Sequence, residues 1–196
     1  MSASPPAAVR QAFLLVGRST RLPEKFRLLV HGEPVLAREQ RILAGLGLEV
    51  TVVSVAPVNL TGLPEIMDRF DRGPLGGLAT ALAATEEPFF LFGGDMPYLD
   101  AGSVDRMRSH FDGRTLVPVG PTGHWEVLHS IYAGIPHDLA ERRTGEGRGL
   151  RDLVAELDLA GKVRFLPAGV VDPRSFTDLD TPEDYARIIG PPSREP

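Results

Sequence analysis

Short apolar runs recur along the chain, and each is bounded by glycine, proline or polar residues. They cover residues 12–16, 50–55, 89–92 and 116–119, and they are rich in branched and aromatic side chains. Runs of this length and composition predict buried strands. Because they are apolar almost without interruption, they favour a parallel sheet that is covered on both faces.

Helical patterns lie between these runs. Residues 34–46 place Leu36 and Leu43 on one stripe, which leaves Glu39 and other charged residues on the expected outer face. Residues 74–84 are rich in alanine and leucine and begin with a proline, which the first turn of a helix tolerates. The alternation of strands and helices predicts an α/β fold, with three layers around a doubly wound, mostly parallel sheet of the Rossmann-like type.

The other elements predicted from the pattern follow later in the chain. They are a helix over residues 104–111, a strand over 124–133, a helix over 150–157 and a strand over 162–166. A closing helix is predicted over residues 181–189. This segment opens on Thr-Pro-Glu-Asp, which combines an N-cap, a first-turn proline and acidic residues.

Composition narrows the class of protein. The 196 residues suit a single domain, expected over residues 12–190 between flexible ends at 1–11 and 191–196. The net charge of -5 argues against a nucleic-acid partner, and the absence of cysteine excludes disulfides, thiolate metal sites and cysteine nucleophiles. No stretch predicts a membrane span or a secretory leader, so we expect no membrane partner and a cytoplasmic location.

The loop after the first predicted strand, residues 17–25, is glycine-led and basic. Gly17 permits close approach of a ligand to the backbone, and Arg18, Arg21 and Lys25 can offset the charge of a triphosphate. The same composition also suits a solvated basic loop. Neither the Walker A spacing nor the Rossmann fingerprint is present.

Two further segments carry candidate chemistry. After Asp68, a glycine- and proline-rich stretch around Gly73 leads into a predicted helix, whose N-terminus favours anionic groups. A tight turn with close helix packing would use the same glycines. The buried strand over 89–92 ends in two glycines and Asp95, which places a carboxylate at the edge of the sheet where such folds bind ligands. A turn-forming or helix-capping aspartate is the alternative.

In order along the chain, these segments resemble the motifs of the GT-A-like nucleotidyltransferases, and most of all those of the molybdenum cofactor guanylyltransferases. The basic loop is similar to Leu-Ala-Gly-Gly-x-Ser-x-Arg-Met-Gly, with Val16 and Pro23 where that family has glycine. The other segments resemble Gly-Pro-Leu-Ala-Gly-Ile and Asp-x-Pro-Phe-Leu, and residues 176–184 resemble Phe-x-Asn-Ile-Asn-Thr-Pro-Glu-Asp. The resemblance spans residues 12–189.

The resemblance implies a set of site residues. The nucleotide-binding positions are Leu15, Val16, Gly17, Lys25, Ser54, Asp68, Gly73 and Asp95. Catalytic roles fall to Arg21, Lys25 and Asp95, and Mg²⁺ would be held by Asp95 and Asp180, whose oxygen ligands suit this ion. Asp178 and Asp180 stand where guanylyltransferases carry asparagine and relatives that use CTP carry aspartate. Both acids would also suit a helix-capping turn.

The implied reaction transfers GMP from GTP to the terminal phosphate of molybdopterin and releases pyrophosphate. The attacking phosphate is already ionised, so positioning and charge neutralisation are expected to do the catalytic work. Transient contact with molybdoenzyme maturation proteins is a further expectation. The alternatives are a cytidylyltransferase or other enzyme with a different phosphorylated acceptor, a catalytically impaired accessory protein, and an unrelated nucleotide binder. The enzyme requires the basic loop and Asp95 to line one cleft.

Overall fold

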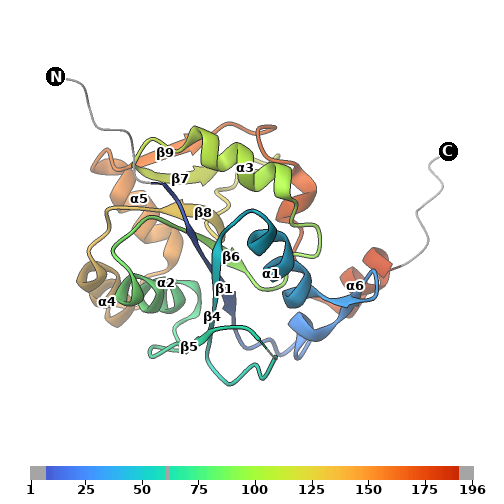
Figure 1. The fold of residues 1–196 in the computed structure, drawn as a ribbon. Coiled ribbons are helices and arrows are strands. Elements are labelled where there is room, and N and C mark those ends of the chain that lie inside the picture. The colour runs from blue at the N-terminus through green and yellow to red at the C-terminus, as the bar shows by residue number, and fades with distance from the viewer. Residues whose placement is uncertain (1–7, 61, 190–196) are drawn as a thin grey trace.

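The computed structural model describes residues 8–60 and 62–189, in which helices pack on both faces of a seven-stranded sheet (Figure 1). The strand order is β5-β4-β1-β6-β8-β7-β9. The strands are β1 (Gln11–Val16), β4 (Glu49–Ser54), β5 (Glu65–Met67), β6 (Phe89–Gly93), β7 (Thr115–Pro118), β8 (His129–Tyr132) and β9 (Val163–Leu166). Among them β8 alone runs against its neighbours. The predicted three-layer, mostly parallel α/β fold is confirmed.

The helices divide between the two faces of the sheet. They are α1 (Val35–Gly45), α2 (Gly73–Ala84), α3 (Ala101–His110), α4 (His137–Gly145), α5 (Leu150–Leu159) and α6 (Pro182–Ile189). Leu36 of α1 and Met107 of α3 belong to one buried cluster, whereas Leu78 of α2 and Leu153 of α5 belong to another. The short helices η1 (Lys25–Arg27) and η2 (Pro173–Phe176) and the hairpin of β2 (Leu29–Val30) and β3 (Glu33–Pro34) lie in the connections.

The central strand β1 shows why the apolar runs are continuous. Ala12, Leu14 and Val16 face the cluster under α1 and α3, whereas Phe13 and Leu15 face the cluster under α2 and α5. Both faces of the strand are therefore buried, and every position favours an apolar side chain. Because β4, β1 and β6 are parallel and in register, their carboxyl ends meet at one edge of the sheet.

Several elements differ from the pattern-based prediction. The strand expected over residues 124–133 is β8 alone, because a turn closed by the Gly123 amide on the Gly120 carbonyl (3.0 Å) precedes it. Helix α3 begins before residue 104, because Asp100 accepts a hydrogen bond from the Ser103 amide (2.9 Å) as N-cap. Helix α4, strand β5 and the β2–β3 hairpin were not predicted.

The boundaries of the predicted domain also change. Residues 1–7 and 190–196 lie outside the described residues, so the flexible tail expected over 191–196 cannot be compared with the structure. The ordered fold begins before residue 12, because Val9 is buried and the Arg10 carbonyl accepts a hydrogen bond from the Glu49 amide (2.8 Å). Within 8–60 and 62–189, no helix combines the length and apolar character that a membrane crossing needs.

Candidate active site

A cavity of about 320 Å³ opens where β4, β1 and β6 end. Its lining includes Gly17 and Lys25 from the loop after β1, Asp68 and Gly73 before and at the start of α2, and Gly94 and Asp95 after β6. The chain runs from β1 to β4 on one side and later to β6 on the other, and ligands bind at such a switch point in doubly wound folds. The expectation that the basic loop and Asp95 line one cleft is confirmed.

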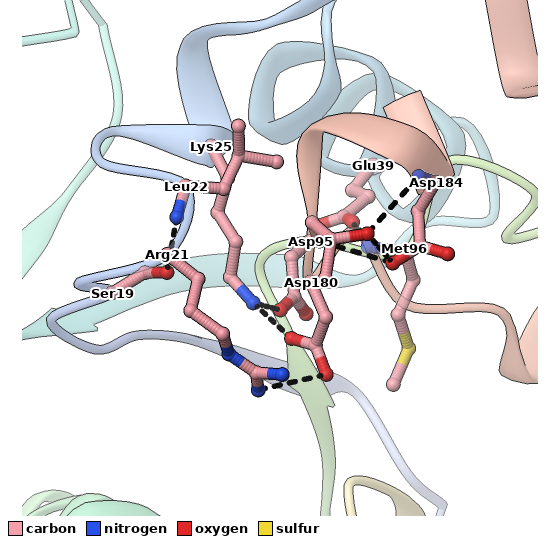
Figure 2. A network of polar contacts seen from close by, with 10 residues as sticks. Ser19, Arg21, Leu22, Lys25, Glu39, Asp95, Met96, Asp180 and Asp184 are labelled. Carbon is pink, nitrogen blue, oxygen red and sulfur yellow. Dashed lines mark hydrogen bonds and ion pairs between the residues drawn. The ribbon is translucent and has the colours of Figure 1, made fainter. Parts of the chain in front are cut away.

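Lys25 lies at the centre of this cleft. Its Nζ is 2.5 Å from Oδ2 of Asp95 and 2.8 Å from Oδ1 of Asp180, so one ammonium group bridges two carboxylates (Figure 2). Burial alone would lower the pKa of Lys25, but the two carboxylates outweigh that effect and raise the pKa above its ordinary value. The ammonium group therefore stays charged. We call Lys25, Asp95 and Asp180 the floor of the cleft; Asp180 is 48% exposed, is not among the residues that line the cavity, and is joined to it through Lys25.

The local sequence turns Lys25 inward. Ser19 accepts a hydrogen bond from the Leu22 amide (3.2 Å), and Glu24 adopts a left-handed backbone conformation with a φ of 50° just before η1 begins. The Phe26 side chain packs against the core, and the Arg27 guanidinium donates a hydrogen bond to the Val58 carbonyl. The turn is thus anchored on both sides of Lys25, and Pro23 is accommodated within it.

Asp95 follows two closely packed glycines, Gly93 at the end of β6 and Gly94. A Cβ atom on Gly93 would lie 2.6 Å from Oδ1 of Asp95. The Gly94 amide donates a hydrogen bond to the Leu15 carbonyl (2.8 Å), and the Asp95 carbonyl accepts one from the Leu179 amide (3.0 Å). Burial raises the pKa of Asp95, an effect that the Lys25 ammonium opposes but does not cancel.

The other cations of the basic loop lie further out. Arg21 Nη2 is 3.7 Å from Oδ2 of Asp180, and Arg18 Nη2 is 3.3 Å from Oδ2 of Asp71. The Arg21 and Arg18 side chains are 68% and 70% exposed, against 17% for Lys25. We call Arg18, Arg21 and Asp71 the rim of the cleft. Arg21 joins the rim to the floor through Asp180.

The start of α2 forms the opposite wall. Oδ1 of Asp68 accepts hydrogen bonds from the Phe70 amide (2.9 Å) and the Thr80 hydroxyl (3.1 Å), which fix the carboxylate in one orientation. Gly73 adopts a φ of 62°, and Pro74 follows in the first turn of α2. No side chain caps the N-terminus of this described helix, so its first amides remain suited to an anionic or polar ligand.

Ser54 takes a different place from the other predicted binding residues. It is buried, it is not among the residues that line the cavity, and its hydroxyl donates a hydrogen bond to Glu65 (2.5 Å). Its neighbours Val53 and Val55 line the cavity instead. Ser54 therefore holds the wall beneath the cleft, and its role in nucleotide binding stays a prediction.

The structure shows how Val16 fits where the related motif has glycine. Leu15 and Val16 both line the cavity, but the Val16 side chain is only 8% exposed and packs in the core beneath α1. A Cβ on Gly94 would lie 2.9 Å from Cγ2 of Val16. The bare backbone at Gly94 thus makes room for the valine, so the side chain turns away from the cleft.

Some residues of the site were not found from the sequence. Phe26 and Leu128 line the cavity, although neither belongs to a motif found in the sequence. Glu39 was expected on the outer face of its helix, but its side chain is fully buried.

The donor groups of the cleft fit a magnesium ion bound together with a nucleotide. Within the described part of the chain, no group of three or more His, Cys, Asp or Glu side chains is arranged to hold a metal ion. Asp95 and Asp180 offer two carboxylates around one position of positive charge, the Lys25 ammonium. Mg²⁺ usually takes one or two carboxylates and completes its shell with phosphates and water.

The fold and the cleft define an α/β nucleotidyltransferase, with a basic loop after the first strand facing a carboxylate after β6. The sequence profile of the MobA-like NTP transferase domain matches residues 12–161. The chain belongs to that family.

Two sequence relatives and one solved structure agree with this assignment. A protein of Pyrococcus furiosus named "Probable molybdenum cofactor guanylyltransferase" is 32% identical over 140 residues, which cover 66% of this chain and 70% of that protein. The molybdenum cofactor guanylyltransferase of Xanthomonas euvesicatoria pv. vesicatoria is 34% identical over 178 residues, which cover 88% and 90%. The crystal structure of molybdopterin-guanine dinucleotide biosynthesis protein A from Archaeoglobus fulgidus matches the fold with a TM-score of 0.74 at 19% identity, over 91% of this chain and 96% of that one.

Proposed function

We propose that the chain transfers GMP from GTP to the terminal phosphate of molybdopterin and releases pyrophosphate. One observation carries the proposal: the basic loop, the start of α2 and Asp95 meet in a single cleft with Lys25 at its centre. Relatives over most of the chain are named for this activity. The reaction would take place in the cytoplasm, and the product would pass to molybdoenzyme maturation proteins by transient contact.

Asp68 is suited to select guanine. One oxygen of its carboxylate is held by the Phe70 amide and the Thr80 hydroxyl, so the other oxygen has a fixed direction. Guanine presents adjacent N–H donors on its pairing edge, whereas cytosine presents only one amino group there, and a carboxylate is an acceptor. The α2 N-terminus at Gly73 adds free amides to the same wall.

The floor of the cleft would neutralise the phosphates. A terminal phosphate oxygen of the acceptor attacks the α-phosphorus of GTP, the bond from that phosphorus to the bridging oxygen breaks, and pyrophosphate leaves with the electron pair. Lys25 stays protonated next to Asp95 and Asp180, so it can stabilise charge on the leaving pyrophosphate. Arg21 can add a second cation from the rim. No protein base is needed, because the attacking phosphate is ionised.

Asp95 and Asp180 would hold Mg²⁺ against the phosphates. The bound ion would supply Lewis acidity and a template for the triphosphate. Lys25 already joins these two carboxylates, so it keeps them together and reduces their mutual repulsion. The protein's own contribution is thus a pre-arranged pair of oxygen ligands next to a permanent cation.

A cytidylyltransferase is the second candidate, because Asp178 and Asp180 stand where relatives that use CTP carry aspartate. The deciding experiment measures pyrophosphate release with each of the four nucleoside triphosphates, with and without molybdopterin and with and without Mg²⁺. The proposal expects turnover with GTP that needs both molybdopterin and the metal. Turnover with CTP instead would favour the second candidate. No pyrophosphate with any nucleotide would contradict the proposal and would favour either a different phosphorylated acceptor or an accessory protein that has lost catalysis.

A further inference from the structure

Glu39 is a buried acid that the proposed reaction does not use. It lies in the middle of α1, its side chain is fully buried, and Oε1 accepts a hydrogen bond from the Met96 amide (2.6 Å; Figure 2). Its other oxygen, Oε2, is buried without a hydrogen-bond partner among the described residues. Burying a carboxyl group costs free energy, so a fully buried glutamate needs a structural explanation.

The amide that Glu39 holds belongs to the residue directly after Asp95. In the same peptide group, the Asp95 carbonyl accepts a hydrogen bond from the Leu179 amide (3.0 Å). The single peptide group between Asp95 and Met96 is therefore held at both of its polar atoms, from two different parts of the fold. The Glu39 side chain accepts one of these hydrogen bonds, and the Leu179 backbone amide donates the other.

Helix α1 also supports the second carboxylate of the floor. Val35, at the beginning of α1, packs with Leu179 in a small fully buried cluster, and Asp180 follows Leu179 directly. One rigid helix thus contacts the turn of Asp95 through Glu39 and the segment of Asp180 through Val35. This helix therefore supports both carboxylates, in addition to the Lys25 ammonium that bridges them.

The surroundings of Glu39 penalise a further negative charge. Burial, together with the nearby negative charges of Asp95 and Asp178, raises its pKa well above the ordinary value for glutamate. In either protonation state, Oε1 can accept the hydrogen bond from the Met96 amide. A glutamine would do the same, whereas an apolar side chain of similar size would leave the amide unpaired.

We propose that Glu39 is a positioning residue, which fixes the turn after β6 so that the Asp95 carboxylate faces a divalent cation held with the nucleotide phosphates. The inference builds on the proposed function, because it assigns to Asp95 a metal that enters with the nucleotide. Glu39 touches neither substrate nor metal; it acts through the Met96 amide.

The test measures how much Mg²⁺ tightens the binding of GTP. Calorimetric titration of the full chain with GTP, once in Mg²⁺ and once in EDTA, gives two dissociation constants, and their ratio reports the coupling between metal and nucleotide. Glu39→Met, which keeps size but has no acceptor, should reduce this ratio about tenfold to a hundredfold, the usual range for losing a group that orients a metal ligand. Glu39→Gln should keep the ratio within a few-fold of the wild type.

Leu43→Ala is the matched control, because Leu43 lies one turn further along the same face of α1 and is fully buried. It should lower the melting temperature and leave the coupling ratio unchanged. If Glu39→Met does not fold, Glu39→Ala replaces it, with folding checked by circular dichroism. A Glu39 variant without an acceptor that keeps the wild-type ratio would overturn the role of Glu39 alone. A wild-type chain in which Mg²⁺ does not tighten GTP binding would overturn the metal proposal and this one together.

Discussion

The floor and the rim of the cleft take cations from the same loop, yet they are built differently. On the floor, Lys25 is 17% exposed and lies within 2.8 Å of two carboxylates. On the rim, Arg21 is 68% exposed and lies 3.7 Å from its partner. Charges interact more strongly where water is excluded, and exposed ion pairs contribute little. The position of each cation in the fold, rather than its charge alone, should therefore decide how much it contributes to catalysis.

Anchoring explains the difference. Lys25 begins a short helix whose next residues are held by the core and by the Val58 carbonyl. Arg18 and Arg21 precede that helix, and their side chains contact only exposed or half-exposed acids. A pre-arranged charge needs no reorganisation when the reaction occurs, whereas a side chain on the rim must first be ordered by the ligand. The comparison predicts that substituting a floor residue lowers turnover strongly, whereas substituting a rim residue lowers it little.

The largest expected effect comes from Asp95→Ala. It removes the carboxylate that we propose as the metal ligand, so kcat for pyrophosphate release should fall on the order of a thousandfold. The melting temperature should change little, because Lys25 keeps Asp180 as a partner at 2.8 Å. Steady-state kinetics and thermal unfolding, measured on the same preparation, check both parts.

Asp105→Ala is the control for that substitution. Asp105 lies on α3, is 57% exposed, and pairs with Arg108 at 3.8 Å. Its removal should leave both kcat and the melting temperature near the wild-type values. Full activity of Asp95→Ala would place the metal elsewhere and would also remove the reason to separate floor from rim.

The next effect sharpens the comparison within the basic loop. Lys25→Met should lower kcat/KM on the order of a hundredfold, because a buried cation that faces the leaving group is lost. Arg21→Met should lower it less than about tenfold, because an exposed charge is screened by water. The Arg21 effect should also shrink as salt is added, since screening acts mainly on exposed charges. Equal losses for the two variants would contradict the comparison.

A stability effect tests how tightly the floor is packed. A methyl group on Gly94 would lie 2.9 Å from Cγ2 of Val16 and 3.0 Å from Cδ1 of Leu36. Gly94→Ala should therefore destabilise the fold by about 1–3 kcal/mol, the usual cost of overpacking. Thermal unfolding measures this effect, and Val16→Ala in the same chain should recover part of it by freeing one of the contacts. An unchanged melting temperature for Gly94→Ala would show that the turn before Asp95 can move.

The sequence predicted the strands and the motifs at their ends better than the contacts between distant segments. Asp95 and Lys25 were found because each follows an apolar strand and a glycine, a pattern that is local. Glu39 was misplaced because a charged side chain was expected to face solvent, although its spacing of three residues from Leu36 and four from Leu43 puts it on their face of the helix. Its face of α1 is covered by the turn after β6, a tertiary contact that no local pattern records.

Elements with weak apolar patterns were also missed. Helix α4 contains many charged residues and buries only Ala140 and Thr144, so it has no clear apolar stripe. Strand β5 has three residues and no buried position, which is too short for a period-two pattern to be recognised. The place of Ser54 beneath the cleft depends on its hydrogen bond to the Glu65 side chain, which lies on the neighbouring strand β5.

The smallest expected effect is that of Asp178→Asn on the pH dependence of stability. Burial, with the charges of Asp95 and Asp180, raises the pKa of Asp178 to about 7, although part of its side chain is open to solvent. The folded chain then binds a proton that the unfolded chain releases between about pH 4 and pH 7, so this group's contribution to stability is lost as pH rises through that window. Asp178→Asn should therefore match the wild type at pH 4 and exceed it at pH 8, by less than about 1 kcal/mol after solvent screening. Thermal unfolding of both chains across this range measures the difference. A difference that does not vary with pH would show that burial and the charges of Asp95 and Asp180 do not raise the pKa of Asp178 in the folded chain.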